Sequence, residues 1–241
     1  MLDLTKFKFQ YITNANEKYS HYSGAKIALD GGCQWIQLRI KENHPPCPLK
    51  KGELVHCGSN SPFLRGQGGC EILDTAFELK ELCNTYDATF IIDDYVEITK
   101  TVEADGVHLG KNDMPIKTAR EILGNNFIIG GTANTVNDII NLTEQGANYI
   151  GLGPFKFTNT KKNLSAILGI EGYQKIFSEL QQLNISIPIV AIGGITVNDI
   201  PTILNTGANG IAISSTILNS TNPLQTTIDI LANITQLRIK N

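Results

Sequence analysis

The sequence predicts an α/β protein that folds as a single (β/α)8 TIM barrel over residues 1–241, with a long irregular insertion after the second strand. Three observations favour this class. Strand-like and helix-like segments alternate from end to end and form eight strand–helix units. Strand segments such as 88–92 and 187–192 are apolar throughout, as is typical of parallel strands buried on both faces. The chain length of 241 residues is also close to the roughly 250 that one such barrel needs.

The first half of the chain supplies four of these units. Apolar residues three or four apart predict a helix after the insertion, beginning near Ile72. Pro115 stands where the next helix should start, and Gly124 stands where it should end. The strands are expected at 7–12, 34–39, 88–92 and 106–109, and the helices at 19–31, 72–86, a short stretch through 98, and 116–123.

The second half repeats the pattern. Thr135 and Asp138 are three residues apart and form a variant of the capping box that begins a helix. Similar tetrapeptides at 104–107, 147–150 and 208–211 each lead a helix into a strand, which favours a repeated unit. The strands are expected at 127–129, 148–152, 187–192 and 210–213, and the helices at 135–145, 170–183, 196–205 and 223–237.

Residues 43–69 do not fit this alternation. The segment is rich in Pro, Gly, Ser and Cys and lies between the second strand and its helix, so it should emerge at the mouth of the barrel. A long loop of this kind is usually functional or disordered. A mobile lid or a disordered insertion is favoured over a zinc site, because the spacings of its His and Cys residues match no common zinc motif.

Composition excludes several classes of function. With 20 basic and 23 acidic residues the net charge is −3, which does not favour a nucleic-acid partner. There is no apolar run of about 18 residues that would predict a membrane span. The N-terminus does not read as a signal peptide, and five scattered cysteines without a Cys-x-x-Cys pair indicate reduced thiols and a cytoplasmic protein.

Charged side chains follow the second, third and fourth strands, at the barrel end where chemistry is found. Alternation places Gln37, Arg39 and Lys41 on one side of the chain. Asp94 and Asp113 are hard oxygen ligands of the kind that Mg²⁺ takes together with substrate phosphates, although each could instead cap a helix. These residues predict a diphosphate bound with magnesium.

A second anionic site is predicted on the other side of the mouth. Residues 151–163, GLGPFKFTNTKKN, place hydroxyl and ammonium groups on a glycine-bearing loop, which suits phosphate oxygens but also fits a solvated basic loop. Gly193-Gly194 and Ser214-Ser215 match the phosphate site often built after strands seven and eight, or a plain tight turn. His108 could be a general base, but its place inside GVHLG favours a supporting role in the core.

Several motifs in order resemble the thiamine phosphate synthase family, also called thiamine phosphate pyrophosphorylases. The resemblance covers nearly the whole chain apart from the irregular segment. The motifs are QLRIK at 37–41, FIIDD at 90–94, DGVHLGKNDMP at 105–115, IGGT at 129–132, YIGLGPFKFTNTKK at 149–162, PIVAIGGI at 188–195 and GANGIAISSTI at 207–217.

This resemblance implies a Mg²⁺-dependent transferase in thiamine biosynthesis. It would join 4-amino-2-methyl-5-hydroxymethylpyrimidine diphosphate to a thiazole phosphate and release pyrophosphate. The implied ligands of the pyrimidine diphosphate are Gln37, Leu38, Arg39, Ile40, Lys41, Asp93, Thr132 and Lys161. Those with a catalytic role would be Arg39, Lys41 and Lys161, and the metal ligands would be Asp94 and Asp113. The implied ligands of the thiazole phosphate are Thr158, Asn159, Thr160, Gly194, Ser214 and Ser215.

The chain departs from the family pattern at a few positions. Asp93 stands where the family usually has Asn, and a carboxylate there would repel the diphosphate unless it were protonated or bound to metal. Ile40 replaces a usual Glu, Lys111 a usual Gln, and Ser214 a usual apolar residue. Two alternatives therefore stay open: a thiazole tautomerase, and a non-catalytic paralogue that binds phosphorylated ligands. The expected partners are small phosphorylated molecules, and a homodimer is also left open.

Overall fold

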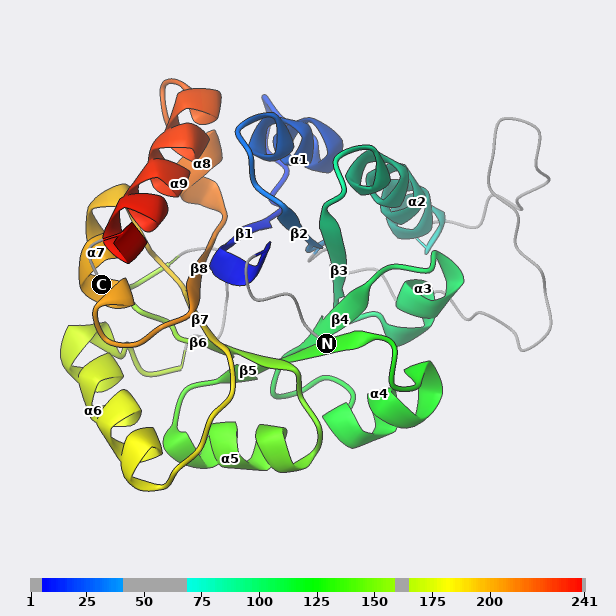
Figure 1. The fold of residues 1–241 in the computed structure, drawn as a ribbon. Helices are drawn as coiled ribbons and strands as arrows, with labels where there is room; N and C mark the ends of the chain where they lie inside the picture. The colour runs from blue at the N-terminus through cyan, green and yellow to red at the C-terminus, as the bar shows by residue number, and fades with distance from the viewer. Residues whose placement is uncertain (1–5, 41–68, 159–164, 240–241) are drawn as a thin grey trace.

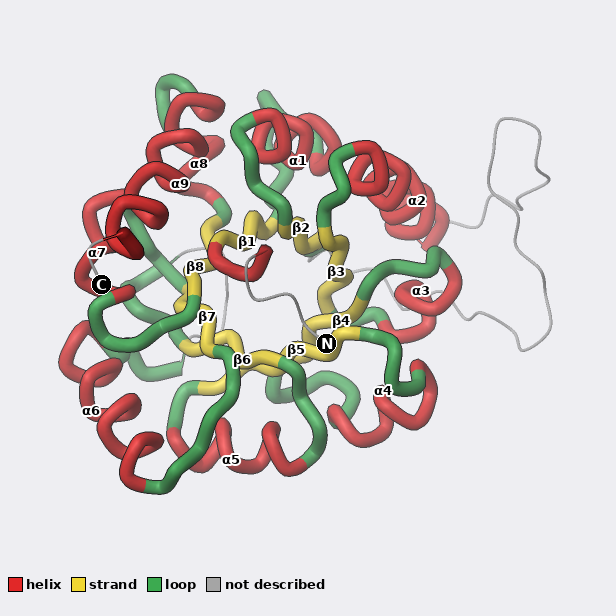
Figure 2. The backbone as a smooth tube through the Cα atoms, viewed as in Figure 1, coloured by secondary structure: helices red, strands yellow, loops and turns green. Residues whose placement is uncertain are grey.

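The structure is a computed structural model that describes residues 6–40, 69–158 and 165–239. Its eight parallel strands pair in sequence order, and the first pairs with the last, so the sheet closes into a barrel (Figures 1 and 2). This confirms the predicted fold class. The strands are β1 Phe9–Ile12, β2 Trp35–Leu38, β3 Thr89–Asp93, β4 Gly106–Leu109, β5 Ile128–Ala133, β6 Tyr149–Leu152, β7 Ile189–Ile192 and β8 Gly210–Ile213.

The helices form a ring outside the strands, as Figure 1 shows. They are α1 His21–Asp30, α2 Gly69–Thr85, α3 Val96–Thr101, α4 Ile116–Leu123, α5 Val136–Glu144, α6 Gly169–Gln182, α7 Ile200–Leu204, α8 Ser215–Leu218 and α9 Pro223–Ile239, with 3-10 helices η1 Lys6–Lys8 and η2 Val197–Asp199. The predicted capping box is present at α5, where the Thr135 side chain accepts from the Asp138 backbone N–H and the Asp138 side chain accepts from the Thr135 N–H.

Three segments differ from the sequence expectation. β5 runs on through Ala133 instead of ending at 129, and its two glycines disfavour a strand by propensity alone. The predicted helix 196–205 divides into η2 and α7, and the four-residue α8 follows β8 where no helix was expected. The predicted irregular segment 43–69 falls between β2 and α2. Gly69 begins α2, and the rest of the segment lies outside the described residues.

The two glycines of β5 have a steric reason. A Cβ atom on Gly130 would lie only 2.2 Å from the Tyr149 ring and 2.6 Å from His108 Nδ1. A Cβ atom on Gly131 would lie 3.0 Å from the Leu142 side chain on the outer face. The strand therefore carries glycine because large side chains from neighbouring elements occupy the space on both of its faces.

An apolar cluster fills the barrel interior toward the amino-terminal ends of the strands, and η1 lies across this end of the barrel (Figure 1). Phe7 of η1 is buried, and its ring centroid lies 4.2 Å from that of Trp35. Trp35 in turn meets Tyr149 edge to face at 4.9 Å. Burial of aromatic rings in such pairs stabilises the core beyond the area that they remove from water. This apolar layer closes the barrel interior below the polar cavity at the carboxyl ends of the strands.

A repeated hydrogen-bond pair joins neighbouring strands at the amino-terminal end of the barrel, between β3 and β4, β5 and β6, and β7 and β8. The residue before β4, β6 and β8 is Asp105, Asn148 and Asn209 respectively. Each side-chain oxygen accepts from a backbone N–H of the preceding strand, and each backbone N–H donates to the carbonyl of that same residue. The repeated tetrapeptides of the sequence thus correspond to a repeated interaction that satisfies otherwise buried backbone groups.

Candidate functional site

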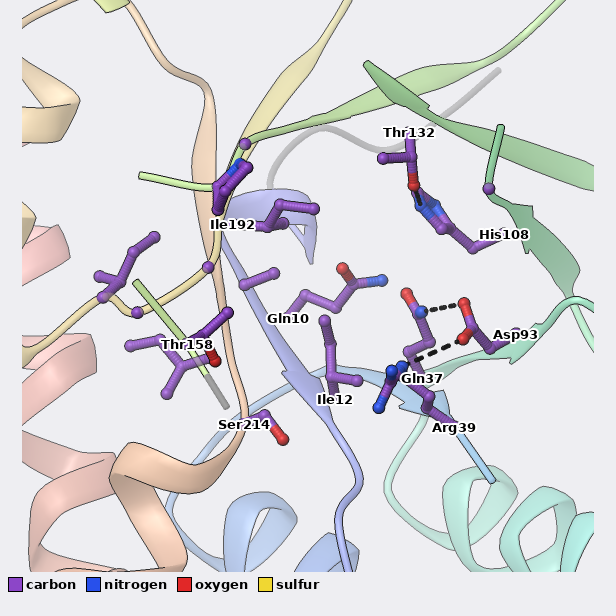
Figure 3. Close-up of a pocket in the computed structure, with 18 of the residues that line it drawn as sticks. Gln10, Ile12, Gln37, Arg39, Asp93, His108, Thr132, Thr158, Ile192 and Ser214 are labelled. Atoms are coloured by element: carbon purple, nitrogen blue, oxygen red, sulfur yellow. Dashed lines mark hydrogen bonds and ion pairs between the residues drawn. The ribbon is translucent and has the colours of Figure 1, made fainter. Parts of the chain in front are cut away.

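A cavity of about 440 Å³ opens at the carboxyl ends of the strands. Residues from all eight strands or from the loops that follow them line it. In Figure 3, Gln37, Arg39 and Asp93 lie on one side, Thr158 and Ser214 lie on the other, and Gln10 and Ile12 lie between them. This is the end of a parallel barrel where catalytic residues are usually found.

The β2 side of the cavity is built around an ion pair. Gln37 Nε2 donates to Asp93 Oδ1 at 2.8 Å, and Arg39 Nε lies 3.4 Å from Asp93 Oδ2 (Figure 3). Asp93 is only 7% exposed, so its charge depends on these partners. Because Asp93 binds the arginine through Nε, it also fixes the direction of the guanidinium group. From the sequence, Asp93 was expected to need a proton or a metal ion to avoid repelling the diphosphate. The ion pair with Arg39 is a third way to offset its negative charge.

Strand alternation explains what the neighbouring residues do. Leu38 is 1% exposed and belongs to the core between the strands and the helices, and Ile40 packs against the same core. The side chains of Leu38 and Ile40 therefore face the helices, while those of Gln37 and Arg39 face the cavity.

Asp94 occupies an unusual backbone conformation at the end of β3. Its φ is +70°, in the left-handed region that residues other than glycine, asparagine and aspartate rarely adopt. Its N–H donates to the carbonyl of His108 on β4 at 2.9 Å, which holds the turn in place. The side chain lines the cavity beside Asp93. Aspartate adopts this conformation more readily than most residues, and single left-handed residues other than glycine cluster at functional sites.

Asp113 follows β4 and is held by its own loop. The Gly110 N–H donates to Asp113 Oδ2 at 2.6 Å, and the Asp113 N–H donates back to the Gly110 carbonyl at 3.2 Å. A Cβ atom on Gly110 would lie 2.8 Å from Oδ2, so only glycine leaves room for this arrangement. The loop thereby orients a half-buried carboxylate at the edge of the cavity.

His108 and Thr132 lie on the β4–β5 side of the cavity. His108 Nε2 lies 2.9 Å from Thr132 Oγ1, and His108 Nδ1 lies 3.0 Å from the Tyr149 hydroxyl. Gln10 Nε2 donates to the same hydroxyl at 3.5 Å. Burial raises the pKa of Tyr149 far above its ordinary value, so the phenol stays protonated. His108 therefore lines the cavity with both ring nitrogens in contact with hydroxyl groups, and its supporting role stays a prediction.

The opposite side of the cavity is formed where the loop after β6 meets the turn after β7. Phe155 N–H donates to the Ile192 carbonyl, and Lys156 N–H donates to the Gly193 carbonyl. A Cβ atom on Gly193 would lie 2.7 Å from Pro154, and one on Gly194 would lie 2.6 Å from the Phe157 carbonyl oxygen. The two glycines therefore let the loop rest directly on the turn, which brings Thr158 next to the ends of β7 and β8.

The described part of the chain brings most predicted site residues together. Lining the cavity are Gln37, Arg39, Asp93, Asp94, Asp113, Thr132, Thr158, Gly194, Ser214 and Ser215. Outside the described residues lie Lys41, Asn159, Thr160 and Lys161, together with His44, Cys47, His56 and Cys57. Within the described ranges no group of three or more His, Cys, Asp or Glu side chains could hold a metal ion. No helix in those ranges is long and apolar enough to cross a membrane.

Gln10, Ile12 and Ile192 also line the cavity, although the sequence did not predict them as site residues. Gln10 is 1% exposed although it is polar. A single amide inside the otherwise apolar strand Phe9–Ile12 was the signal that could have indicated it, because a polar side chain among buried ones requires a partner.

Known proteins of one family match this chain over most of its length. A family model described as Thiamine monophosphate synthase matches residues 9–217. The thiamine-phosphate synthase of Bacteroides thetaiotaomicron is 49% identical over 222 residues, which cover 92% of this chain and 95% of that protein. That of Phocaeicola vulgatus is 49% identical over 220 residues, covering 91% and 94%. The solved thiamine phosphate pyrophosphorylase of Pyrococcus furiosus superposes with a TM-score of 0.77 at 30% identity, covering 97% of this chain and 98% of that one.

Proposed function

This chain belongs to the thiamine monophosphate synthase family, and from this premise we propose how the cavity at its barrel mouth performs the family reaction. The enzyme joins the pyrimidine diphosphate to the thiazole phosphate in thiamine biosynthesis, giving thiamine phosphate and pyrophosphate. The assignment of the two substrate sites rests on the two sides of one cavity. One side holds the Arg39–Asp93 pair and two further carboxylates, and the other holds a glycine-bearing turn with hydroxyl groups.

The pyrimidine diphosphate belongs on the β2–β5 side. Arg39 meets Asp93 through Nε, and its two terminal nitrogens extend the same planar fork that suits phosphate oxygens. Thr132 adds a hydroxyl group from β5. Lys41 and Lys161 are assigned here by resemblance alone, since both lie outside the described residues.

A magnesium ion fits the carboxylates of the same side. Asp94 and Asp113 come from separate strand ends, line the same cavity, and present the hard oxygen donors that Mg²⁺ takes alongside substrate phosphates. When bound there, the ion would neutralise charge on the diphosphate. The Gly110 hydrogen bond to Asp113 and the left-handed turn at Asp94 hold both side chains at the rim before substrate arrives.

The chemistry then needs no protein nucleophile. The bond between the pyrimidine methylene carbon and the diphosphate oxygen breaks, and its electron pair leaves with pyrophosphate. The thiazole nitrogen supplies the electron pair of the new carbon–nitrogen bond. Arg39 stabilises the negative charge that grows on the leaving oxygens, and the walls of the cavity hold the two rings in line.

The thiazole phosphate belongs on the β6–β8 side. Thr158, Ser214 and Ser215 line this part of the cavity with hydroxyl groups, and Gly194 after β7 lets the loop that carries Thr158 pack directly on the turn. The loops after strands seven and eight, with a short extra helix, often form a phosphate site in such barrels, and α8 is a helix of this kind.

A coupled assay of pyrophosphate release tests the proposal. With both substrates and Mg²⁺ we expect release of pyrophosphate and formation of thiamine phosphate in equal amounts. Omitting the thiazole phosphate, or chelating the metal, should stop both. Isomerisation of a thiazole carboxylate phosphate without pyrophosphate release, or binding of both ligands without turnover, would overturn the proposal.

The cellular location and the assembly of the enzyme remain predictions. Cys33 and Cys83 are buried free thiols, which is consistent with the expected reduced cytoplasmic compartment. A homodimer remains to be tested by measuring the mass of the protein in solution.

A further inference from the structure

We propose that Gln10, Tyr149 and His108 form a directed chain of hydrogen bonds that positions the Thr132 hydroxyl group as a donor to the bound diphosphate. This inference rests on the proposed function for its ligand. The three residues would not touch the reacting atoms themselves, so they are positioning residues that act through Thr132.

The direction of the chain begins at Gln10. The amide nitrogen Nε2 lies 3.5 Å from the Tyr149 hydroxyl oxygen, and an amide N–H can only donate. The oxygen of Tyr149 therefore accepts from Gln10, which leaves the hydrogen of Tyr149 available to the next partner. That partner is His108 Nδ1, which lies 3.0 Å away.

The tautomer of His108 passes this direction on. In a neutral imidazole ring one nitrogen donates and the other accepts. If Nδ1 accepts from Tyr149, then Nε2 carries the hydrogen and donates to Thr132 Oγ1, 2.9 Å away. A hydroxyl oxygen that accepts from His108 turns its own hydrogen elsewhere. Because Thr132 lines the cavity, that hydrogen is available to an anionic ligand.

The reverse direction would suit an anion poorly. With the amide of Gln10 turned over, Tyr149 would donate to Gln10 and accept from Nδ1 of His108. Thr132 would then donate its hydrogen to Nε2 and present only lone pairs to the cavity, where they would repel phosphate oxygens. The orientation of the Gln10 amide and the charge of the diphosphate therefore favour the same direction.

The barrel makes room for this chain and then locks it. Gln10 and His108 are buried at 1% and 6% exposure, and Tyr149 is wholly buried. A Cβ atom on Gly130 or Gly151 would lie 2.6 Å or 3.0 Å from the His108 ring, so glycine at both positions leaves space for the imidazole. From below, the Tyr149 ring rests against Trp35. Side chains held this tightly keep one geometry, as a positioning role requires.

The tautomer of His108 is the direct test. In enzyme labelled with ¹⁵N at histidine, His108→Gln identifies the His108 resonances among the four histidines of the chain. We expect the hydrogen on Nε2 in the free enzyme. Tyr149→Phe removes the donor to Nδ1 and should give a mixture of tautomers. A wild-type His108 with its hydrogen on Nδ1 would overturn the inference.

Kinetics supply the second test. Tyr149→Phe and Gln10→Leu should raise the KM for the pyrimidine diphosphate about tenfold, as expected for a weakened hydrogen bond to a charged group, with little change in the KM for the thiazole phosphate. Thr132→Val should match that loss, the double variant Thr132→Val/Tyr149→Phe should add little to it, and Thr132→Ser should restore binding. Unchanged KM values in both Tyr149→Phe and Gln10→Leu would overturn the chain.

Tyr173→Phe is the matched control. Tyr173 is also a buried tyrosine, but its hydroxyl group donates to the Leu152 carbonyl on the far side of β6. Its loss should lower stability without changing either KM. Because the NMR experiment needs no turnover, an inactive wild-type enzyme with the Nε2–H tautomer would refute the proposed function and leave the hydrogen-bond chain standing.

Discussion

Aspartate and asparagine residues stand at both ends of the barrel and serve different purposes there. At the amino-terminal end, the side chains of Asp105, Asn148 and Asn209 accept from backbone N–H groups of the preceding strands. At the carboxyl end, Asp94 and Asp113 come after strands instead of before them, and both line a cavity beside Arg39.

The difference lies in what each end of a strand leaves unsatisfied. At the amino-terminal end, a short polar side chain satisfies the backbone of a neighbouring strand and closes the sheet. At the carboxyl end, glycines and a left-handed turn hold the chain in shapes that direct carboxylates toward a common space. We infer that the position along the strand, rather than the residue type, separates stabilising carboxyl and amide groups from functional ones.

Asp113→Asn should produce the largest effect and test the mouth side of this comparison. Asparagine keeps an oxygen that can accept from the Gly110 N–H, so the loop should survive while the negative charge is lost. We expect turnover to fall by about a hundredfold or more, with the melting temperature nearly unchanged. Pyrophosphate release at a series of Mg²⁺ concentrations measures it.

Asp94→Asn is the companion variant at the same site. Asparagine tolerates the left-handed backbone at this position, so a loss of activity would report the missing charge and not a broken turn. Near-normal turnover in both variants would contradict the assignment of these carboxylates to the metal.

Asp93→Asn should have a smaller effect, and it should improve substrate binding instead of impairing the reaction. Asparagine can still accept from Gln37, while the charge that neutralises Arg39 disappears. A more positive cavity should lower the KM for the pyrimidine diphosphate by about threefold, because the arginine then acts on the ligand alone. Steady-state kinetics over a range of salt concentrations would detect the change. A collapse of turnover instead would place Asp93 with the metal ligands.

The sequence predicted the barrel because its signals are local and repeated. Apolar strands, helix ends at glycine and the motif at Thr135 need no knowledge of distant contacts. The length of β5 could not be predicted in this way, because Gly130 is explained by Tyr149 and His108 on the two neighbouring strands. Neither could the split of the helix after β7, or the short α8.

For the candidate site, too, local features could be predicted from the sequence and contacts between strands could not. Alternation correctly placed Gln37 and Arg39 toward the cavity, since the period of a strand is a property of the sequence itself. The partner of Asp93 and the contact between Tyr149 and His108 depend on register between strands, which single-sequence patterns do not carry. Gln10 is different, because the single amide in the apolar strand Phe9–Ile12 was a local signal, although its partner Tyr149 was not.

Asn148→Ala should test the amino-terminal side of the comparison. The side-chain oxygen of Asn148 accepts from the Ile129 N–H at 2.8 Å and from Arg120 Nη2 at 2.6 Å. Leaving these donors unsatisfied should lower the free energy of unfolding by about 1–3 kcal/mol. Thermal and urea unfolding measure this loss. The kinetic constants should not move, and Asn148→Asp, which keeps an acceptor oxygen, should recover part of the stability. A drop in turnover at full stability would contradict the division of roles.

The smallest effect is expected where the two roles meet, at a helix cap near the mouth. Residues 135–138 and 196–199 have the same sequence, TVND, and both form capping boxes. Asp138 pairs with Lys111 at 2.7 Å, and Asp199 pairs with Lys156 at 2.6 Å. Burial raises the pKa of Asp138. Hydrogen bonds from Lys111 and from the Asn134 N–H together lower this pKa by more, so the net shift is downward.

The sign of this shift sets the pH dependence of Asp138→Asn. A carboxyl group whose pKa is lowered by folding stabilises the folded state above its unfolded pKa of about 3.9, and this contribution is lost as the pH falls through the lower folded value. At pH 7 the variant should be less stable by about 1 kcal/mol, and the difference should vanish in acid. Asp199→Asn should behave alike, because the pKa of Asp199 is shifted in the same direction by similar contacts. A difference that stays constant from neutral to acid pH would mean that the cap acts through its hydrogen bonds and not through its charge.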